Sequence, residues 1–295
     1  MELEMKDLTK KFGDMEAVSH VSYGLTNGVY GLLGVNGAGK TTLMRMLCTL
    51  LEPSSGTITC DGREIGQMGS AYRDLLGYLP QEFGYYPDFN PEDYLMYIAA
   101  LKGLKPSVMK HRTSELLSQV GLSQVRKKKI KKLSGGMKRR LGIAQAMLNH
   151  PRVLILDEPT AGLDPNERIR FRNLISELAA DRIVLLSTHI VSDVEYIAGD
   201  ILLMKDGHIE GSGSPQELVK GMPCVVWELE APRSEAERYL SAYKVSNVKM
   251  HGTLVGLRLL ADEKPSENAV AVEASLEDVF LYYFGAKGED GDGLL

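Results

Sequence analysis

The stretch "YGLLGVNGAGKTTLMRML", Tyr30 to Leu47, begins as an apolar run, breaks into glycines around Lys40 and continues with helical character. Residues 34–41 match G-x-x-x-x-G-K-[ST], and the match lies between a predicted strand and a predicted helix, as the motif requires. Glycines let successive backbone N–H groups point into one hollow, where the positive end of the following helix also attracts an anion. The pattern predicts a polyphosphate-binding loop. Taken alone, it also fits a glycine-rich connector with a solvated lysine.

In such a loop we expect Lys40 to reach the β and γ phosphates and the Thr41 hydroxyl to bind Mg²⁺. Lys40 is also a predicted catalytic residue, because its charge would lie beside the phosphate that is transferred. The predicted nucleotide-binding residues of the loop are Gly34, Asn36, Gly37, Ala38, Gly39, Lys40, Thr41 and Thr42.

Two further apolar runs end in polar residues and are followed by helical patterns, "RVLILD" at residues 152–157 and "RIVLLST" at residues 182–188. Continuous hydrophobic strands that alternate with helices indicate a parallel sheet covered on both faces. In "TITCDGREI", from Thr57, the pair Asp61-Gly62 predicts an antiparallel hairpin added to this core. The predicted fold is therefore α/β, a mostly parallel sheet covered by helices with an N-terminal antiparallel β subdomain.

A helical subdomain is expected at about residues 88–150. Asn90 as cap and Pro91 at the first helical position start one helix, and Tyr94, Ile98 and Leu101 follow at a spacing that predicts core packing. A second helix is expected from about Ser107 to Val120.

The composition changes at "GSGSPQELVKGMP", from Gly211, where a short helix begins at Ser214. We place the domain boundary there, with a first domain at residues 1–219 and a small α+β domain at 220–284. Its expected elements are a strand at Val225, a helix from Ser234, strands near Val248 and Leu254, and a last helix capped by Ser275, with Leu276, Val279, Phe280 and Tyr283 packed inward. The glycine-rich acidic segment 285–295 is predicted to be a flexible tail.

The overall composition is that of an ordinary globular protein, with 44% hydrophobic and 25% charged residues among 295. A formal net charge of −5 offers no basic field for nucleic acid, and no nucleic-acid partner is expected. Three cysteines without a CxxC pair, and no charged-then-apolar leader, indicate a reduced cytoplasmic chain. The longest apolar runs are shorter than the roughly 18 to 20 residues that span a bilayer, so the chain is not expected to cross a membrane by itself.

Two carboxylates, Asp157 and Glu158, end the buried run in "VLILDEPT". Adjacent acids rarely end a core strand without a role, although a solvent-facing turn before Pro159 is the plain alternative. We predict that Asp157 holds Mg²⁺ and that Glu158 polarises a water molecule. With the glycine-lysine loop, the pair predicts a P-loop nucleotidase, and the lack of an N/T-K-x-D sequence favours ATP over GTP.

The segment "LSGGMKRRLGIAQAML", Leu133 to Leu148, precedes the acidic strand. Ser134 followed by Gly135 and Gly136 predicts a helix start with uncovered amides, a second anion-binding end. As a bare pattern it could be only a capped helix entry. In this position it resembles the signature of ATP-binding cassette (ABC) ATPases, and the resemblance covers essentially the first 220 residues. Met137 stands where glutamine is commonest in that family.

The resemblance implies roles for four more residues. In "YLPQEFGYYP", Gln81 would contact Mg²⁺ or the attacking water. In "AGLDP", Asp164 would face the nucleotide and also cap the next helix through Glu167. In "LLSTH", His189 would contact the γ-phosphate and share the load with Glu158, the expected general base. In "KKFGD", Phe12 would stack on adenine. Taken singly, the glutamine, the histidine and the phenylalanine also fit a loop residue, a core histidine and an edge aromatic.

In this family, the signature of one cassette closes over ATP held by the loop of another. The resemblance therefore implies a head-to-tail dimer with a second copy or a paralogous cassette, and a separate membrane-spanning permease that holds the chain at the inner face of the cell membrane. The closing "SLEDVFLYYFG" resembles the C-terminal element of ATPases that pair with ABC-2 type permeases, which implies export. The alternative is a soluble ABC ATPase of translation or DNA repair.

Overall fold

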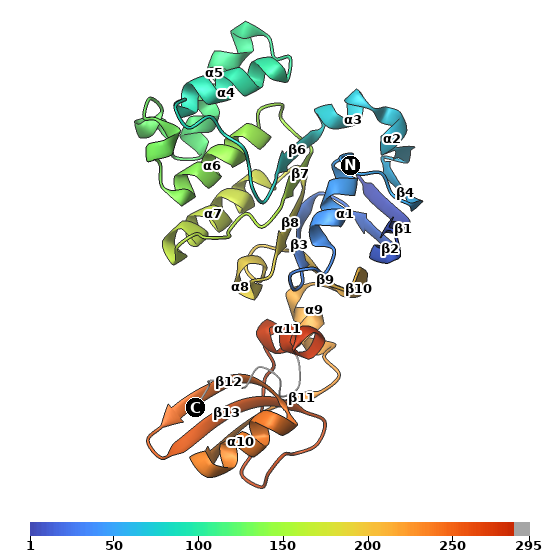
Figure 1. The fold of residues 1–295 in the computed structure, drawn as a ribbon, viewed down its shortest axis with the longest axis vertical. Coiled ribbons are helices and arrows are strands. Elements are labelled where there is room, and N and C mark those ends of the chain that lie inside the picture. The colour runs from blue at the N-terminus through green and yellow to red at the C-terminus, as the bar shows by residue number, and fades with distance from the viewer. Residues whose placement is uncertain (286–295) are drawn as a thin grey trace. The chain divides into compact units, whose positions relative to one another are not determined.

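The computed structural model describes residues 1–285 of the 295-residue chain (Figure 1). It contains two compact units, the first at Met1–Ile209 and the second beginning at Glu210. The sequence placed its boundary further along, after residue 219. The predicted tail lies outside the described residues except for Gly285. No helix among residues 1–285 has both the length and the apolar character to cross a bilayer.

The main sheet has six strands in the order β10-β9-β3-β8-β7-β6, of which β10 only begins in the first unit and the other five lie wholly within it. Strands β6, β7, β8, β3 and β9 run parallel, which confirms the predicted mostly parallel sheet. All residues of β7 and β8 are buried, as the uninterrupted apolar runs require. The bounds are β3 Gly28–Leu33, β6 Leu76–Leu79, β7 Val153–Leu156, β8 Ile183–Thr188, β9 Asp200–Lys205 and β10 His208–Gly213.

Helices cover both faces of this sheet, as Figure 1 shows. Helix α1 (Lys40–Leu47) packs into the cluster that contains Leu32 and Ile155, whereas α7 (Pro165–Leu178) and α8 (Val191–Val194) lie on the other side. On that side a Cβ on Gly31 would come within 2.7 Å of Val194. The two-layered covering confirms the α/β prediction.

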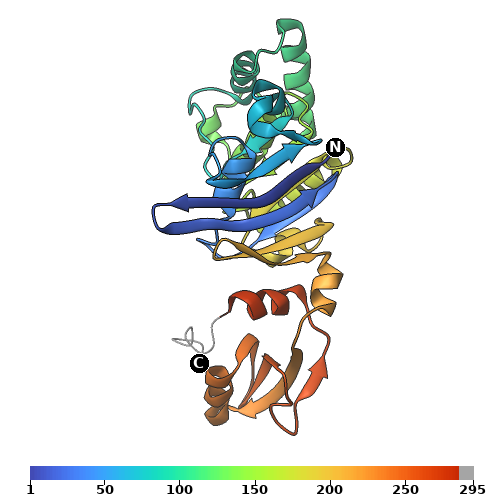
Figure 2. The same cartoon turned by 90° about the vertical axis from the view of Figure 1, so that its right-hand side faces the viewer.

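A second sheet, antiparallel and ordered β2-β1-β4-β5, packs against the first unit's core. Its strands are β1 Leu3–Phe12, β2 Met15–Leu25, β4 Ser55–Cys60 and β5 Arg63–Glu64, and Figure 2 shows the long β1–β2 hairpin. The turn between β4 and β5 contains Asp61 and Gly62, both at positive φ (47° and 76°), as a two-residue hairpin of this type needs. The predicted hairpin is confirmed. Short helices α2 (Ile65–Met68) and α3 (Ser70–Asp74) follow.

The helical segment comprises α4 (Pro91–Leu101), α5 (Pro106–Gln119) and α6 (Gly135–Ala146), with single 3₁₀ turns at Ser123–Val125 and Ile130–Lys132. The Asn90 side chain accepts a hydrogen bond from the Asp93 N–H at 2.9 Å, which confirms the predicted cap. The predicted core stripe of α4 is wrong in part. Tyr94 is buried, but Leu101 is 67% exposed, because it ends the helix where the chain turns away through Gly103.

The second unit contains the antiparallel sheet β12-β13-β11-β14 and three helices. The bounds are α9 Pro215–Lys220, β11 Val225–Pro232, α10 Arg233–Ala242, β12 Lys244–His251, β13 Leu254–Ala261, β14 Val270–Val272 and α11 Leu276–Phe284. Ser214 and Ser275 each cap a helix, as predicted, and each does so through a capping box. On α11, Leu276 and Val279 are buried, whereas Phe280 and Tyr283 are only half-buried. The three-residue edge strand β14 was not predicted.

Candidate active site

The glycine-lysine loop joins β3 to α1, the arrangement that its sequence predicts. Gly37 and Gly39 have φ values of 85° and 102°, in the left-handed region that favours glycine. A Cβ on Gly34 would come within 2.3 Å of the Met204 carbonyl oxygen, and one on Gly39 within 2.3 Å of the Ala17 carbonyl oxygen. The loop therefore follows a path that only a backbone without side chains at these points can take.

A cleft of about 700 Å³ opens beside this loop. Its lining brings together ten of the predicted site residues, seven from the loop and the start of α1 and three from other parts of the chain: Asn36, Gly37, Ala38, Gly39, Lys40, Thr41, Thr42, Phe12, Gln81 and Glu158. Phe12 ends β1 and is 46% exposed, with the Lys10 ammonium 5.3 Å from its ring centroid. An exposed aromatic face at the rim of a cleft is suited to stacking on a planar base.

Lys40 is the cation of this cleft, and its side chain is buried. Its ammonium donates hydrogen bonds to the Gly34 and Val35 carbonyl oxygens, at 2.6 and 3.0 Å, and lies 3.7 Å from the Glu158 carboxylate. Burial lowers the pKa of Lys40, and the charges of Glu158 and Asp157 partly oppose this shift. A poorly hydrated ammonium of this kind is a strong partner for phosphate oxygens.

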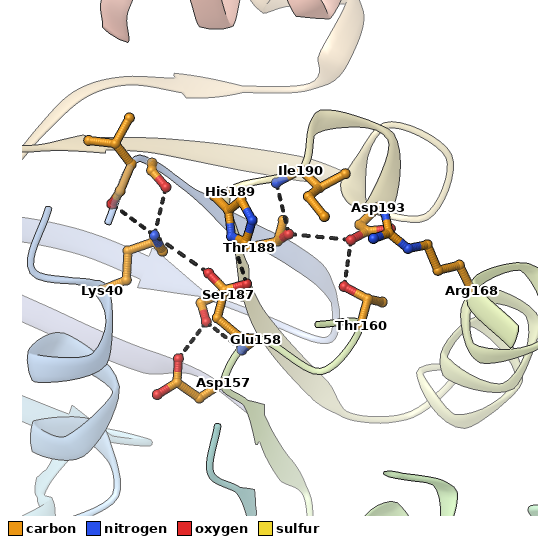
Figure 3. A network of polar contacts seen from close by, with 12 residues as sticks. Lys40, Asp157, Glu158, Thr160, Arg168, Ser187, Thr188, His189, Ile190 and Asp193 are labelled. Carbon is orange, nitrogen blue, oxygen red and sulfur yellow. Dashed lines mark hydrogen bonds and ion pairs between the residues drawn. The ribbon is translucent and has the colours of Figure 1, made fainter. Parts of the chain in front are cut away.

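The acid pair follows β7, and a serine from the neighbouring strand β8 holds both members (Figure 3). The Ser187 hydroxyl donates to one Asp157 carboxylate oxygen at 2.6 Å and accepts from the Glu158 N–H at 2.9 Å. The other Asp157 oxygen, Oδ2, and the Glu158 Oε1 are buried and have no hydrogen-bond partner within residues 1–285. Buried carboxylate oxygens without partners are costly unless a ligand completes them.

His189 follows β8 and lies against Glu158, with its Nδ1 3.0 Å from the Glu158 Oε2 (Figure 3). Strands β7 and β8 are parallel neighbours, so their carboxyl ends meet at one edge of the sheet. This topology explains why residues 31 positions apart in the sequence are in contact.

The signature residues lie apart from the cleft, because none of Ser134, Gly135, Gly136 and Asp164 lines it. The Ser134 hydroxyl caps α6 by accepting from the Met137 N–H at 3.2 Å. Gly135 lines a separate hollow of about 210 Å³ to which Gln81 also contributes. The Asp164 carboxylate accepts from the Glu167 N–H at 2.9 Å, which confirms the predicted cap of α7.

A second buried network, which the sequence did not predict, adjoins the acid pair (Figure 3). The carboxylate of Asp193, on α8, accepts hydrogen bonds from the Thr160 and Thr188 hydroxyls at 2.5 and 3.4 Å. Arg168 lies 3.8 Å from the same carboxylate. This network joins the segment after Glu158 to the strand end that carries His189.

Ser187 and Arg139 were also missed, although the sequence held a signal for each. Ser187 is a polar residue near the end of an otherwise apolar strand, "IVLLST". Arg139 lies three residues after Gly136 and four before Ile143, a spacing that puts it on the buried face of α6. Neither signal indicates which residue forms the hydrogen bond, because the bonding partners lie in other elements.

The donor set suits a hard divalent cation, since Thr41, Asp157 and Gln81 all offer oxygen ligands. Asp157 Oδ2 is a buried acceptor that such an ion would complete. Within the described residues, no group of three or more His, Cys, Asp or Glu side chains could hold a metal. Few protein ligands are typical of Mg²⁺ that is bound together with substrate phosphates.

Comparison with known sequences gives consistent results. An ABC transporter family model matches residues 18–161. The chain is 38% identical over 251 residues to the uncharacterized ABC transporter ATP-binding protein YxlF of Bacillus subtilis (strain 168), with 83% of each chain covered. It is 32% identical over 300 residues to Nod factor export ATP-binding protein I of Burkholderia orbicola (strain AU 1054), with 98% of each covered.

Solved structures give the same picture. The structure of an ATP binding subunit of an ABC transporter matches with a TM-score of 0.66 and 27% identity, covering 75% of this chain and 92% of that one. A dimeric bacterial ABC transporter cassette shares the fold, with a TM-score of 0.65 and 23% identity over 72% of this chain and 98% of that one. The matched family region contains both the glycine-lysine loop and the acid pair, and a relative matches along almost the full length. The chain is therefore an ABC ATPase and belongs to the ATP-binding proteins of ABC transporters.

Proposed function

We propose that this ATP-binding subunit hydrolyses MgATP in a dimer of cassettes and transmits the resulting motion to a separate exporter permease. The observation that carries the site assignment is the convergence of Lys40 and two incompletely bonded carboxylates beside a phosphate-binding loop. Backbone N–H groups of the loop would surround the phosphates, with Lys40 on the β and γ phosphates. Phe12 would stack on the adenine at the rim of the cleft.

Thr41, Asp157 and Gln81 would hold Mg²⁺, which would neutralise charge that develops on the phosphate oxygens. Ser187 fixes one Asp157 oxygen through its hydroxyl, and this leaves Oδ2 available to the ion.

Glu158 is the group we assign as general base. Its Oε1 is buried without a hydrogen-bond partner among the described residues, so it can accept a proton from an attacking water. Its Oε2 lies 3.0 Å from His189 Nδ1. This contact orients the carboxylate and would place the imidazole ring beside the γ-phosphate. Lys40, 3.7 Å from Glu158 Oε1, adds positive charge where the transferred group would lie.

A second cassette is part of this proposal, because the signature residues do not line the chain's own cleft. Ser134, Gly135 and Gly136 start α6 with backbone amides that can bind an anion across a dimer interface. Asp164 would lie at the same interface. A cassette that shares this fold has been solved as a dimer, which supports a pair of cassettes. The second member would be a copy of this chain or a paralogous cassette.

Export through a partner permease is supported by the names of the relatives. They include a Nod factor export protein, and also a probable multidrug ABC transporter ATP-binding protein of Escherichia coli (strain K12), 35% identical over 73% of this chain and 38% of that one. The permease would hold the subunit at the cytoplasmic face of the cell membrane.

ATP turnover measured with candidate partners tests this function. The purified chain should hydrolyse MgATP, and co-reconstitution with a candidate exporter permease should raise kcat. Stimulation by ribosomes or DNA, with no response to the permease, would replace the transport proposal with the soluble alternative.

A further inference from the structure

Arg139 lies in the middle of α6 and is 8% exposed, with its guanidinium surrounded by main-chain oxygen atoms. Its five hydrogen-bond acceptors are the carbonyl oxygens of Pro80, Gln81, Asp157, Glu158 and Pro159. The bonds to Gln81 and Pro159 measure 2.7 and 2.9 Å. One side chain therefore bonds to both the segment that carries Gln81 and the segment that carries the acid pair.

This guanidinium is a charge buried among neutral acceptors, since none of its hydrogen bonds within residues 1–285 goes to a carboxylate. Burial lowers the pKa of Arg139, and the nearby charges of Asp157 and Glu158 partly oppose this. Burying a charge is costly, and an apolar side chain would fill the same space at a lower cost. Five carbonyl acceptors indicate that this position requires several N–H donors on one planar group, and among side chains only the guanidinium of arginine offers them.

The Arg139 guanidinium helps to hold the main chain of Glu158 in an unusual conformation. Glu158 has a φ of 45°, a left-handed conformation that is unfavourable for glutamate and persists only where its surroundings enforce it. Its N–H donates to the Ser187 hydroxyl, and its C=O accepts from Arg139. Both peptide groups that flank the Glu158 side chain are thus fixed, one from β8 and the other from α6.

Helix α6 is itself held against the start of the Gln81 segment. A Cβ on Gly142 would come within 2.6 Å of the Leu79 side chain, so the helix packs there with its backbone. A helix held this close places the Arg139 guanidinium between the two segments with little freedom to move.

We propose that Arg139 is a positioning residue that fixes the mutual placement of Gln81 and Glu158 for hydrolysis. This inference rests on the proposed role of Glu158 as general base. Arg139 does not itself line the cleft, and its hydrogen bonds go to main-chain oxygens of the Gln81 and Glu158 segments and not to the loop around Lys40. Its removal should therefore slow the chemical step and leave ATP binding intact.

The test compares Arg139→Met, Arg139→Lys and a matched control, Arg112→Met, for kcat and KM. Arg112 is also buried (3% exposed), and it donates to the carbonyl oxygen of Met147, at the end of α6, at 2.6 Å. It bonds to neither motif segment. We expect Arg139→Met to lower kcat about 100-fold, the cost of a misplaced catalytic group, with KM changed by less than about 3-fold. Arg139→Lys should retain an intermediate kcat, because an ammonium keeps the charge but has three donors. Arg112→Met should keep the wild-type kcat.

ATP affinity is measured separately in the Glu158→Gln background, with and without Arg139→Met. Equal affinity supports the inference. A loss of affinity as large as the loss of kcat would overturn it, as would wild-type kcat in Arg139→Met or an equal fall in Arg112→Met. If Arg139→Met does not fold, wild-type kcat in Arg139→Lys would overturn it as well. Absence of turnover in the unmodified chain, with any partner, would instead refute the proposed function and this inference with it.

Discussion

Each of the two units contains a buried carboxylate network, and the two differ in how completely they are bonded. In the second unit, both oxygens of Asp278 are satisfied, with Ser246 on one and Ser275 on the other, and Arg258 bonds to both. In the first unit, Asp157 and Glu158 each have a buried oxygen without a hydrogen-bond partner among the described residues. A complete network stabilises a fold, whereas an incomplete one at the end of a sheet is a place for a ligand.

The largest effect is expected at Glu158, on the incomplete side. Glu158→Gln keeps the size and hydrogen-bonding shape of the side chain but removes the basic oxygen. We expect kcat to fall about 1000-fold, within the range for loss of a general base. ATP binding should persist, and size-exclusion chromatography with MgATP should show an accumulated dimer. Phosphate release measures the rate, and a wild-type rate would place the base elsewhere.

Lys40 should give the next largest effect, in binding. Lys40→Ala removes the buried ammonium that would pair with phosphate oxygens, so ATP affinity should fall about 100-fold, the value of a strong charged hydrogen bond. Calorimetric titration with a non-hydrolysable analogue measures it. The control is Lys102→Ala, because this lysine is exposed and its ammonium donates to the Asn149 side chain at 3.0 Å, away from the cleft. Equal losses in both variants would contradict the assignment.

On the complete side, Asp278→Asn should affect stability and leave ATP affinity unchanged. The substitution removes the buried one of the two carboxylates that pair with Arg258 and leaves only Glu228, so we expect the unfolding free energy of the second unit to fall by about 2 kcal/mol. Denaturant unfolding followed by Trp227 fluorescence reports on that unit, since Trp227 lies in β11. An unchanged midpoint would show that the network adds nothing.

Asp278→Asn should also change how the stability of the second unit depends on pH. Burial acts to raise the pKa of Asp278, but hydrogen bonds from Arg258, Ser246 and Ser275 together outweigh it and hold the pKa below its usual value. A carboxyl whose pKa is lower in the folded state contributes stability that is full above the unfolded pKa, about 3.9, and is lost as pH falls through the folded pKa. The wild-type second unit should therefore lose stability below about pH 4, and Asp278→Asn should show a smaller loss over that range.

Local patterns predicted the parts of the molecule that depend on neighbours in sequence. The loop around Lys40, the caps at Asn90, Ser214 and Ser275, and the alternation of apolar runs with helices all fall in this class. The position of an acid pair at a strand end was also readable, because the burial of the strand is encoded in its own residues.

Contacts between distant segments were not predicted. Ser187 is 30 residues from Asp157, and Arg139 is 58 from Gln81, so sequence spacing does not indicate either bond. Leu101 was misplaced because helical periodicity gives the face of a helix but not the residue at which that helix ends. The apolar pattern therefore specified the scaffold, whereas the polar residues that orient the acids became visible only in three dimensions.

The left-handed backbone at Glu158 has a consequence for how this position tolerates change. In a library randomised at residue 158, two requirements would favour different residues. The left-handed backbone favours glycine, asparagine or aspartate, whereas the proposed chemistry requires glutamate. Selection for thermal robustness alone should therefore enrich inactive survivors, and selection for transport should retain a residue that the backbone disfavours.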